Sequence, residues 1–369
     1  MCLLKLAVMP KSSSSEIFFD PLDMKIGFYN ESHFLMGNHM FRDSNTVSGA
    51  GDDLLLPYVR LKEVANRQDI ECVTVDTLPF DAFDAYVFCE MPHAADSTFQ
   101  AVKKSGKPCY LIICENHFLC KPNGDIERYQ DFERVFTYND DMVDGEKVLK
   151  LNYAFDLPKS ISGINEKKDK LAVMICSNHK RDIKHLVYAQ RRETINWFQD
   201  HQPETFDLYG LGWERGTLPF QTKPELQRTL RRFGLLRFFP VKKYPSWRGK
   251  VARKRDVLGN YRFGFCYENT TEIPGYITEK IFDVMMAGTV PVYLGPNNAS
   301  SHIPESCFVN RAEFPDHASL FSYLSEMSDE RYTEYREAID GFLSSAHSYE
   351  FSIDCFVDRL LTAIIGQRT

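Results

Sequence analysis

Short runs of apolar residues alternate with longer polar stretches in the first half of the chain. Three of these runs predict buried strands, namely Lys25–Tyr29, Ala85–Cys89 and Cys109–Cys114. The stretch Leu54–Arg67 instead places its apolar residues at helical spacing. Because near-continuous apolar strands separated by helices are typical of a parallel sheet covered on both faces, we expect an α/β domain here.

The same pattern starts again after a polar and charged segment, Ser160–Lys170, which predicts a linker. Further strands are expected at Leu171–Cys176, Phe206–Tyr209, Tyr261–Tyr267 and Val290–Leu294, with helices at Arg191–Gln199 and Glu350–Ile365. Two α/β units joined by one linker predict a ligand cleft between them.

We therefore divide the chain into four parts. They are an N-terminal α/β domain of residues 1–160, a linker of residues 161–170, a C-terminal α/β domain of residues 171–348, and a helix of residues 349–369. The last helix could pack back on the N-terminal domain.

Composition agrees with this division and excludes several classes of protein. The chain has 369 residues, of which 43% are hydrophobic and 26% charged, so disorder and coiled coil are excluded as the main state. The net charge of −7 argues against a general nucleic-acid binder. Ten cysteines without a C-x-x-C motif indicate buried thiols in a reducing compartment. No apolar run reaches 18 residues, so we expect a cytoplasmic protein that could touch the inner face of a membrane.

One stretch has the opposite charge to the rest. Residues 223–255 contain twelve Lys or Arg and a single acid, Glu225. Apolar residues are interleaved with these cations, a composition that suits an interfacial helix on an anionic membrane. The alternative is an insertion packed on the second domain, with its cations solvated or near a phosphorylated ligand.

Neither a metal site nor a nicotinamide site is indicated. The sequence has no D-x-D motif, and we interpret the adjacent pairs Asp52–Asp53 and Asp140–Asp141 as solvated or capping residues. In the run Gly210-Leu-Gly212-Trp-Glu-Arg-Gly216, the third glycine comes one residue too late for a dinucleotide fingerprint. That run therefore predicts a tight loop after a strand.

Chemistry-bearing residues are densest between 261 and 295. A strand ends at Glu268-Asn269, a polar loop follows, and Thr278 stands at the N-cap position of a helix with Gly288 just beyond its end. A helix that starts between two strands aims free N–H groups at an anion. Lys280 in the first turn is locally unfavourable unless an anion sits beside it. The segment therefore predicts a phosphate site, with a solvent-exposed lysine as the alternative.

Three runs in this segment carry a family resemblance. They are F-x-x-C-Y-E-N at residues 263–269, G-Y-I-T-E-K-I-F-D at residues 275–283, and A-G-x-V-P-V-Y-x-G at residues 287–295. Together they resemble the donor-binding signature of the α-1,3-fucosyltransferases, the family that includes the Lewis-antigen enzymes. The resemblance is strong in the second half, loose from about residue 85, and slight in residues 1–80.

The resemblance implies a fold and a reaction. The fold is two facing Rossmann-like domains around a central cleft, the GT-B glycosyltransferase architecture. The second domain would bind GDP-fucose and the first would supply the acceptor site. The reaction would invert the anomeric centre and need no metal or other cofactor.

The resemblance also implies roles for individual residues. Arg191 and Lys280 would hold the diphosphate, and spacing to the following strand favours Arg191 over its neighbour Arg192. Glu279 would bind ribose hydroxyls. The other donor-binding residues would be Tyr276, Asn269, Glu268 and Thr278.

The resemblance further implies that Glu115 is the general base, and its position after a predicted strand, facing the cleft, suits that role. From the residues alone, a solvated or helix-capping glutamate remains the alternative. We expect an inverting GDP-fucose-dependent fucosyltransferase that acts on a GlcNAc-type hydroxyl of an oligosaccharide or lipid-linked glycan, most simply with an α-1,3 linkage. The rivals are the same fold with another nucleotide sugar and a glycan- or nucleotide-binding protein without catalysis. The sequence does not determine the acceptor, the choice of 3-OH or 4-OH, or the oligomeric state.

Overall fold

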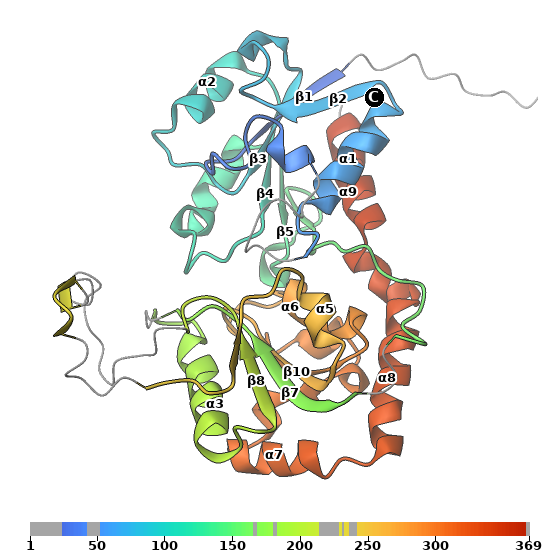
Figure 1. The fold of residues 1–369 in the computed structure, drawn as a ribbon. Helices are drawn as coiled ribbons and strands as arrows, with labels where there is room; N and C mark the ends of the chain where they lie inside the picture. Colours follow the sequence, from blue (N-terminus) through green and yellow to red (C-terminus); the bar gives the residue numbers. More distant parts are fainter. Residues whose placement is uncertain are drawn as a thin grey trace, which may run out of the picture.

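Two parallel β-sheets organise the molecule, one above the other in Figure 1. The computed structural model describes residues 24–42, 52–164, 168–179, 183–213, 229–230, 232–235 and 242–366. Each sheet has six strands among these residues, and all the printed strand pairs are parallel. The expected architecture of two α/β domains is confirmed.

The N-terminal sheet has the strand order β2-β1-β3-β4-β5-β6. Its strands are β1 (Met24–Tyr29), β2 (Ile70–Thr74), β3 (Ala85–Cys89), β4 (Cys109–Ile113), β5 (Arg134–Thr137) and β6 (Val148–Lys150), with helices α1 (Leu56–Asn66) and α2 (Ser97–Ser105). The strand order reverses between β1 and β3, which is where an open α/β sheet forms a crevice at the carboxyl ends of its strands.

The C-terminal sheet has the order β12-β11-β10-β7-β8-β9, which is the Rossmann order with its switch point between β7 and β10. Its strands are β7 (Lys170–Ile175), β8 (Phe206–Tyr209), β9 (Trp247–Gly249), β10 (Tyr261–Tyr267), β11 (Val290–Leu294) and β12 (Val309–Asn310). Its helices are α3 (Tyr188–His201), α5 (Lys254–Leu258), α6 (Glu279–Met286), α7 (His317–Ser325) and α8 (Asp329–Leu343).

Helix α6 lies unusually close to strand β10. Gly264 permits this contact, because a Cβ atom at that position would lie only 2.8 Å from Cγ1 of Val284. At the other end of the helix, Gly288 adopts a left-handed conformation with φ of 68°, as expected for the residue that follows a helix. Together these glycines fix where the first turn of α6 reaches the edge of the sheet.

The chain passes between the domains twice, and the two crossings lie side by side. Phe155 donates its N–H to the carbonyl of Phe351 at 2.8 Å, and Ile353 donates back to the carbonyl of Phe155 at 3.2 Å. Helix α9 (Ile353–Ile365) then packs on the N-terminal domain beside α1, as Figure 1 shows, and contributes Phe356 and Leu360 to that core. The last helix therefore ties the two domains together.

The segment predicted as a linker is partly anchored. Ile161 is buried, and its N–H donates to Oδ1 of Asp340 in α8 at 2.5 Å. Residues 165–167 lie outside the described part of the chain. The described residues 160–164 are therefore docked by the buried side chain of Ile161 and by a carboxylate on α8.

Candidate functional site

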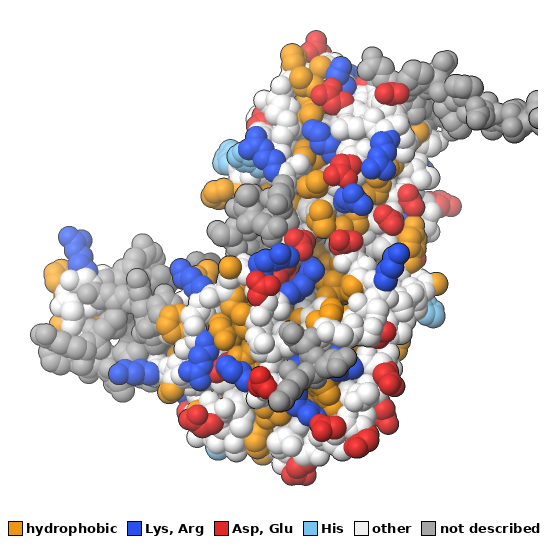
Figure 2. All heavy atoms as spheres, turned by 45° about the vertical axis from the view of Figure 1, so that its right-hand side comes forward, with side chains coloured by type: hydrophobic (Ala, Val, Ile, Leu, Met, Phe, Trp, Pro, Cys, Tyr) orange, Lys and Arg blue, Asp and Glu red, His pale blue; other side chains and the backbone are white. Residues whose placement is uncertain are grey.

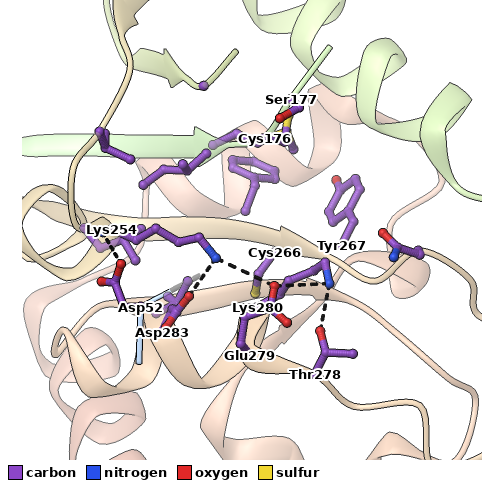
Figure 3. A pocket seen from close by; sticks show the side chains of 18 of the residues that line it. Asp52, Cys176, Ser177, Lys254, Cys266, Tyr267, Thr278, Glu279, Lys280 and Asp283 are labelled. Atoms are coloured by element: carbon purple, nitrogen blue, oxygen red, sulfur yellow. Dashed lines mark hydrogen bonds and ion pairs between the residues drawn. The ribbon is translucent and has the colours of Figure 1, made fainter. Parts of the chain in front are cut away.

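A pocket of about 840 Å³ lies where the two domains meet, at the carboxyl ends of β7 and β10. It is lined from the N-terminal domain by Asp52, Leu54, Glu115 and Tyr153, and from the C-terminal domain by residues that include Ser177, Arg191, Gly210, Lys250, Lys254, Asn269, Tyr276, Thr278, Glu279, Lys280 and Asp283. Figure 3 shows many of these side chains around the first turn of α6. The switch point of the Rossmann sheet is thus the floor of the pocket.

Arg191, on α3, is held against the end of β10 and still reaches the pocket. Its Nη2 group donates to the carbonyls of Tyr267 and Glu268 and to Oδ1 of Asn269, at 2.5, 2.7 and 3.0 Å. Within the described part of the chain, no hydrogen bond engages its Nη1 and Nε atoms. Arg192 lies outside the lining and donates to the carbonyl of His179. The structure therefore places Arg191, and not its neighbour, in the pocket.

Lys280 lies in the first turn of α6 and has carboxylates beside it. Its Nζ atom is 3.3 Å from Oε2 of Glu268 and 3.4 Å from Oε1 of Glu279, and it donates to Oγ1 of Thr278 at 2.8 Å. Burial lowers the pKa of Lys280, but these two carboxylates raise it more, so the lysine stays charged. The anion that the sequence argument required beside Lys280 is therefore present in the protein itself, so the position of this lysine does not by itself require a bound phosphate.

Glu279 sits between two lysines, as Figure 3 shows. Its Oε1 atom is 3.4 Å from Nζ of Lys280 and 3.7 Å from Nζ of Lys254. Burial raises the pKa of Glu279, but both lysines lower it, with a net value of about 2. Lys254 also donates to Asp283 at 2.9 Å. Sequence reasoning missed Lys254 and assigned no role to Asp283, although Asp283 ends one of the recognised runs.

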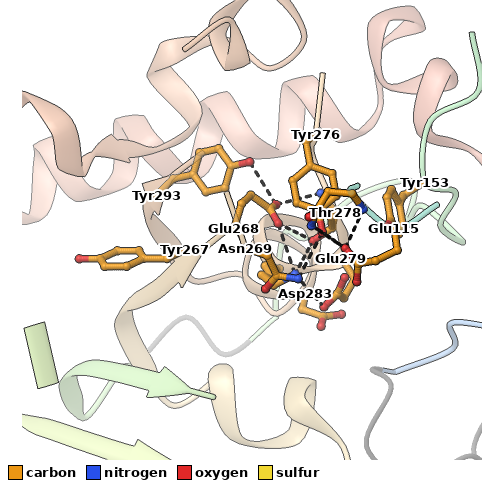
Figure 4. Close-up of polar contacts among 12 residues, drawn as sticks. Glu115, Tyr153, Tyr267, Glu268, Asn269, Tyr276, Thr278, Glu279, Asp283 and Tyr293 are labelled. Carbon is orange, nitrogen blue, oxygen red and sulfur yellow. Dashed lines mark hydrogen bonds and ion pairs between the residues drawn. The ribbon is translucent and has the colours of Figure 1, made fainter. Parts of the chain in front are cut away.

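Glu268 and Thr278 do not behave alike. Glu268 is fully buried and is not part of the pocket lining. Its carboxylate accepts hydrogen bonds from the N–H and Oγ1 of Thr278, at 2.8 and 2.7 Å, and from the hydroxyl of Tyr293 at 3.2 Å (Figure 4). Thr278 does line the pocket, but its side chain bonds Glu268 instead of capping α6. The geometry indicates that Glu268 fixes the start of α6 and does not contact a sugar-nucleotide donor.

Glu115 comes from the other domain, two residues beyond the end of β4. Its Oε1 atom accepts hydrogen bonds from the hydroxyl of Tyr276 at 2.8 Å and from the N–H and Nδ2 of Asn116 at 2.9 and 2.6 Å (Figure 4). Among the described residues, nothing donates to Oε2. Asn269 donates to the same Tyr276 hydroxyl at 3.2 Å. One carboxylate oxygen is thus fixed and the other is left for a ligand.

The remaining carboxylates at the end of the N-terminal sheet do not reach the pocket. Glu90 is half-buried next to Glu115, and its oxygens accept from the N–H groups of Cys114 and Glu115. Glu31 accepts from the N–H of His93 at the surface. Neither is among the lining residues, so Glu115 is the carboxylate that the N-terminal sheet offers to the site.

The two aspartate pairs proved to have specific partners across the domain boundary. Asp52 accepts from the N–H groups of Lys254 and Arg255, both at 3.1 Å, and so caps α5 of the other domain. Figure 2 shows acidic and basic side chains side by side at the junction of the domains. The expected capping role holds for Asp52, but its helix is about 200 residues away in sequence.

Asp140 is not solvated, contrary to expectation. It accepts from Lys150 and from Asn298 and His302 of the C-terminal domain, the last two at 2.7 Å each. Burial raises the pKa of Asp140, but hydrogen bonds from His302 and Lys150 lower it well below its usual range. Asp140 was misinterpreted because Asn298 and His302 lie more than 150 residues further along the chain, whereas its neighbour Asp141 is exposed, as expected.

The loop Gly210–Gly212 is a tight turn against the end of β7. Both glycines have positive φ, 126° and 86°, and a Cβ at Gly210 would lie 2.1 Å from the carbonyl oxygen of Cys176. This agrees with a tight loop after a strand. Gly216 lies outside the described residues.

The basic stretch 223–255 divides into two parts. In its described later part, Lys242 pairs with Asp200, Arg248 pairs with Asp207, and Lys254 with Asp283, so these cations are packed on the C-terminal domain. In its earlier part, residues 223–228, 231 and 236–241 lie outside the described residues. The described residues there include Phe233 and Leu235, which are 67% and 41% exposed.

The described residues contain neither a cluster of metal-ligating side chains nor a helix that could span a membrane. No group of three or more His, Cys, Asp or Glu side chains there could hold a metal ion. None of the helices in that part of the chain is long and apolar enough to cross a membrane.

Known proteins resemble this chain most clearly around the pocket's C-terminal wall. Residues 165–342 match the family model described as "Glycosyltransferase family 10 (fucosyltransferase) C-term". This segment is similar to a family 10 glycosyltransferase domain. It contains Arg191, Asn269, Tyr276, Glu279 and Lys280, which all line the pocket.

Curated relatives of the family 10 domain align over short lengths. An α-(1,3)-fucosyltransferase FucT of Helicobacter pylori is 34% identical over 74 residues, which is 20% of this chain and 15% of that protein. An α-(1,3)-fucosyltransferase 4 of Bos taurus is 33% identical over 105 residues, which is 28% of this chain and 25% of that protein. The chain thus matches a quarter or less of the length of these relatives.

Solved structures extend the likeness to the whole fold. The crystal structure of an α1,3-fucosyltransferase with GDP-fucose superimposes with a TM-score of 0.54, covering 97% of this chain and 94% of that one at 14% sequence identity. The structural neighbours are GT-B glycosyltransferases, so both domains have that fold.

Proposed function

We propose that this protein is a fucosyltransferase that moves L-fucose from GDP-fucose to a hydroxyl group of a GlcNAc-type glycan. The observation that carries this proposal is the composition of one pocket. Its C-terminal wall presents Arg191, Lys280 and the first turn of α6, and its N-terminal wall presents the carboxylate of Glu115. The family 10 match over residues 165–342 and the names of the relatives support fucose as the sugar.

The C-terminal wall suits a nucleoside diphosphate as a leaving group. When the C1–O bond to the diphosphate breaks, negative charge grows on the phosphate oxygens, and fixed cations and helix N–H groups stabilise that charge most in the transition state. The Nη1 and Nε atoms of Arg191 and the charged Nζ of Lys280 would supply this stabilisation. Glu279, which stays ionised between two lysines, would accept hydrogen bonds from the ribose hydroxyls.

Glu115 would remove the proton from the acceptor hydroxyl. A general base needs an oxygen free to approach that proton, and Oε2 is that oxygen because Oε1 is already bonded by Tyr276 and Asn116. The acceptor oxygen would form its bond to C1 while the bond from C1 to the diphosphate breaks. In the same step, the proton of the acceptor hydroxyl would pass to Oε2 of Glu115. Tyr276, Asn269 and Thr278 complete the donor side of the pocket.

We further propose that the reaction inverts the anomeric carbon. One carboxylate from one domain and cations from the other suit a single displacement, with the nucleophile and leaving group on opposite faces of the sugar. GDP-fucose carries a β-linked fucose, so an α-linked product means inversion. Proton NMR of the product decides this point, because a β-linked product contradicts it.

The proposed linkage rests on the names of relatives. The two relatives described above are called α-(1,3)-fucosyltransferases, which favours transfer to a 3-OH, whereas another relative, from Arabidopsis thaliana, is called an α-(1,4)-fucosyltransferase. A panel of GlcNAc- and Glc-terminated oligosaccharides with blocked 3-OH or 4-OH groups separates these choices.

A weak contact with anionic membranes is a second proposal, which concerns the stretch 223–255. Phe233 and Leu235 are exposed beside Arg232, a combination that gains from both apolar burial and attraction to acidic lipids. Co-sedimentation with vesicles containing phosphatidylserine at low salt tests it. Protein that stays entirely in the supernatant contradicts the membrane contact and leaves the transfer proposal untouched.

The test of the main proposal is a donor screen. Purified protein is incubated with the acceptor panel and with GDP-fucose, GDP-mannose, UDP-glucose or UDP-GlcNAc. The masses of the products are measured by mass spectrometry. We expect one deoxyhexose added from GDP-fucose. Transfer from another donor would support the alternative that the enzyme uses a different nucleotide sugar. Tight GDP binding with neither transfer nor donor hydrolysis would support a binding protein without catalysis.

A further inference from the structure

Glu115 stands on a short loop whose main-chain polar groups all have partners. The carbonyl of Cys114 accepts from the hydroxyl of Tyr153, and the carbonyl of Glu115 accepts from Nδ2 of Asn123 at 2.8 Å. The N–H of Asn116 donates to the side chain of Glu115, and its carbonyl accepts from the N–H groups of two following residues. The two groups left to account for are the N–H groups of Cys114 and Glu115.

Both of those N–H groups donate to Glu90, which follows the last residue of β3. Oε1 of Glu90 accepts from the N–H of Glu115 at 2.8 Å, and Oε2 accepts from the N–H of Cys114 at 3.3 Å. Oε2 also accepts from Nδ2 of Asn123 at 2.6 Å. Three N–H donors therefore converge on one carboxylate.

The orientation of Asn123 makes a carboxylate the required group at position 90. Oδ1 of Asn123 accepts from the N–H of Met91 at 2.9 Å, so its Nδ2 must face Glu90 and the carbonyl of Glu115. Asn123 is buried. A glutamine at position 90 would turn one NH₂ group toward donors, whereas a carboxylate presents only acceptors.

The backbone of Glu90 is also unusual. Its φ of 75° lies in the left-handed region, which is costly for a residue with a side chain and easy for glycine. Its N–H donates to the carbonyl of Ile112 at 2.8 Å, so this conformation is built into the ladder between β3 and β4. A residue kept in a strained conformation where glycine would fit better indicates that its side chain is needed.

We propose that Glu90 is a positioning residue for Glu115, whose carboxylate fixes the main chain of residues 114–115 and thereby aims Oε2 of Glu115 at the acceptor hydroxyl. The inference rests on the proposed function of Glu115 as the base. Burial raises the pKa of Glu90, while its hydrogen bond from Asn123 lowers it, which is consistent with a carboxyl enclosed beneath the site. Glu90 itself touches no part of the pocket.

The test compares Glu90→Gln and Glu90→Gly with the wild type and with Glu127→Gln, which changes an exposed carboxylate. Glu90→Gln keeps the shape of the side chain but removes an acceptor, and Glu90→Gly removes the carboxylate while relieving the backbone. We expect both Glu90 variants to lose roughly 10- to 100-fold in kcat for transfer, the effect of losing one to two hydrogen bonds to a charged group. The Kd for GDP should stay within about twofold, because GDP would bind the other domain.

Hydrogen–deuterium exchange supplies a readout that does not depend on the sugar. The amide hydrogens of residues 114–116 should exchange faster in both Glu90 variants than in the wild type. In Glu127→Gln their exchange rate should equal that of the wild type. The inference is overturned if exchange there is unaltered, if kcat stays within twofold, or if GDP binding falls in parallel with kcat. Absence of fucosyl transfer by the wild type would instead overturn the proposed function, while the exchange result would still decide whether Glu90 fixes the loop.

Discussion

The hydroxyl of Tyr276 donates to Oε1 of Glu115 across the boundary between the two domains, over 2.8 Å. Tyr276 belongs to the polar loop before α6, and Glu115 to the loop after β4. The same hydroxyl accepts from Nδ2 of Asn116 and of Asn269, each at 3.2 Å. The C-terminal wall of the pocket therefore contacts the carboxylate that we propose as the base, and this contact exists only when the domains are together.

Replacing Tyr276 with Phe should reduce kcat for transfer roughly 10- to 100-fold, because the carboxylate of Glu115 loses a hydrogen bond from a buried donor. Steady-state kinetics measures the effect, and thermal melting checks the fold. The matched control is Tyr138→Phe, whose ring centre lies 4.9 Å from that of Tyr276 and whose hydroxyl makes no hydrogen bond to Glu115. Equal kinetics for the two variants would show that the hydroxyl of Tyr276 does not orient the base.

Replacing Arg191 with Ala should weaken GDP binding and lower transfer by about 10²-fold or more, since one fixed donor to the leaving group is lost. Arg192→Ala changes the next residue, which does not line the pocket and donates to the carbonyl of His179, and should change both quantities only a few-fold. Isothermal titration with GDP measures the difference.

Arg191 also holds two carbonyls of the β10 end, so the alanine variant could lose stability. Arg191→Lys keeps a charge there and separates the two effects. Normal GDP affinity in a folded Arg191 variant would contradict a role in phosphate binding.

The parts of the site that could be predicted from the sequence are those formed by neighbouring residues in the chain. The segment 261–295 was predicted well, since β10, the start of α6, Gly288 and β11 are encoded by neighbouring residues. Arg191, Lys280 and Glu115 were placed in one pocket by resemblance, and the structure brings them together there.

The errors involved contacts that arise only when the chain folds, whether the partners are 10 residues apart, as Glu268 and Thr278 are, or 162 residues apart, as Asp140 and His302 are. Glu268 was assigned to the donor, but its carboxylate fixes Thr278 and Tyr293 inside the domain. Asp140 was taken for a solvated residue because its partner His302 lies 162 residues away. Neither partner can be inferred from local periodicity, since only the pairing of sheets and domains creates it.

Transfer should survive removal of metal ions. Arg191 and Lys280 supply two positive charges for a diphosphate, and the sequence contains no D-x-D motif to hold a divalent cation. The measurement is turnover in excess EDTA after dialysis. Activity lost in EDTA and restored by manganese or magnesium would contradict the prediction.

Stability should depend on pH through Glu90. Burial raises the pKa of Glu90 from its ordinary value of 4.5 to about 7 in the folded protein. Folding therefore takes up a proton between these values, and the associated stabilisation, about 3 kcal/mol, is complete below pH 4.5 and lost as the pH rises through 7.

Differential scanning calorimetry between pH 5 and 8 tests this dependence. The Tm of the wild type should fall by a few degrees relative to that of Glu90→Gln as the pH rises, because the amide does not titrate. A constant difference between the two proteins across this range would show that Glu90 titrates normally.

The most direct measurement is the rate of fucosyl transfer by Glu115→Gln with saturating GDP-fucose and acceptor. The substitution nearly preserves the shape of the side chain and removes its basicity, so we predict a loss of roughly 10²- to 10⁴-fold in kcat while the Kd for GDP is unchanged. A Glu115→Gln variant that transfers fucose within a few-fold of the wild-type rate would contradict the account, because no other carboxylate of the N-terminal sheet among the described residues lines the pocket.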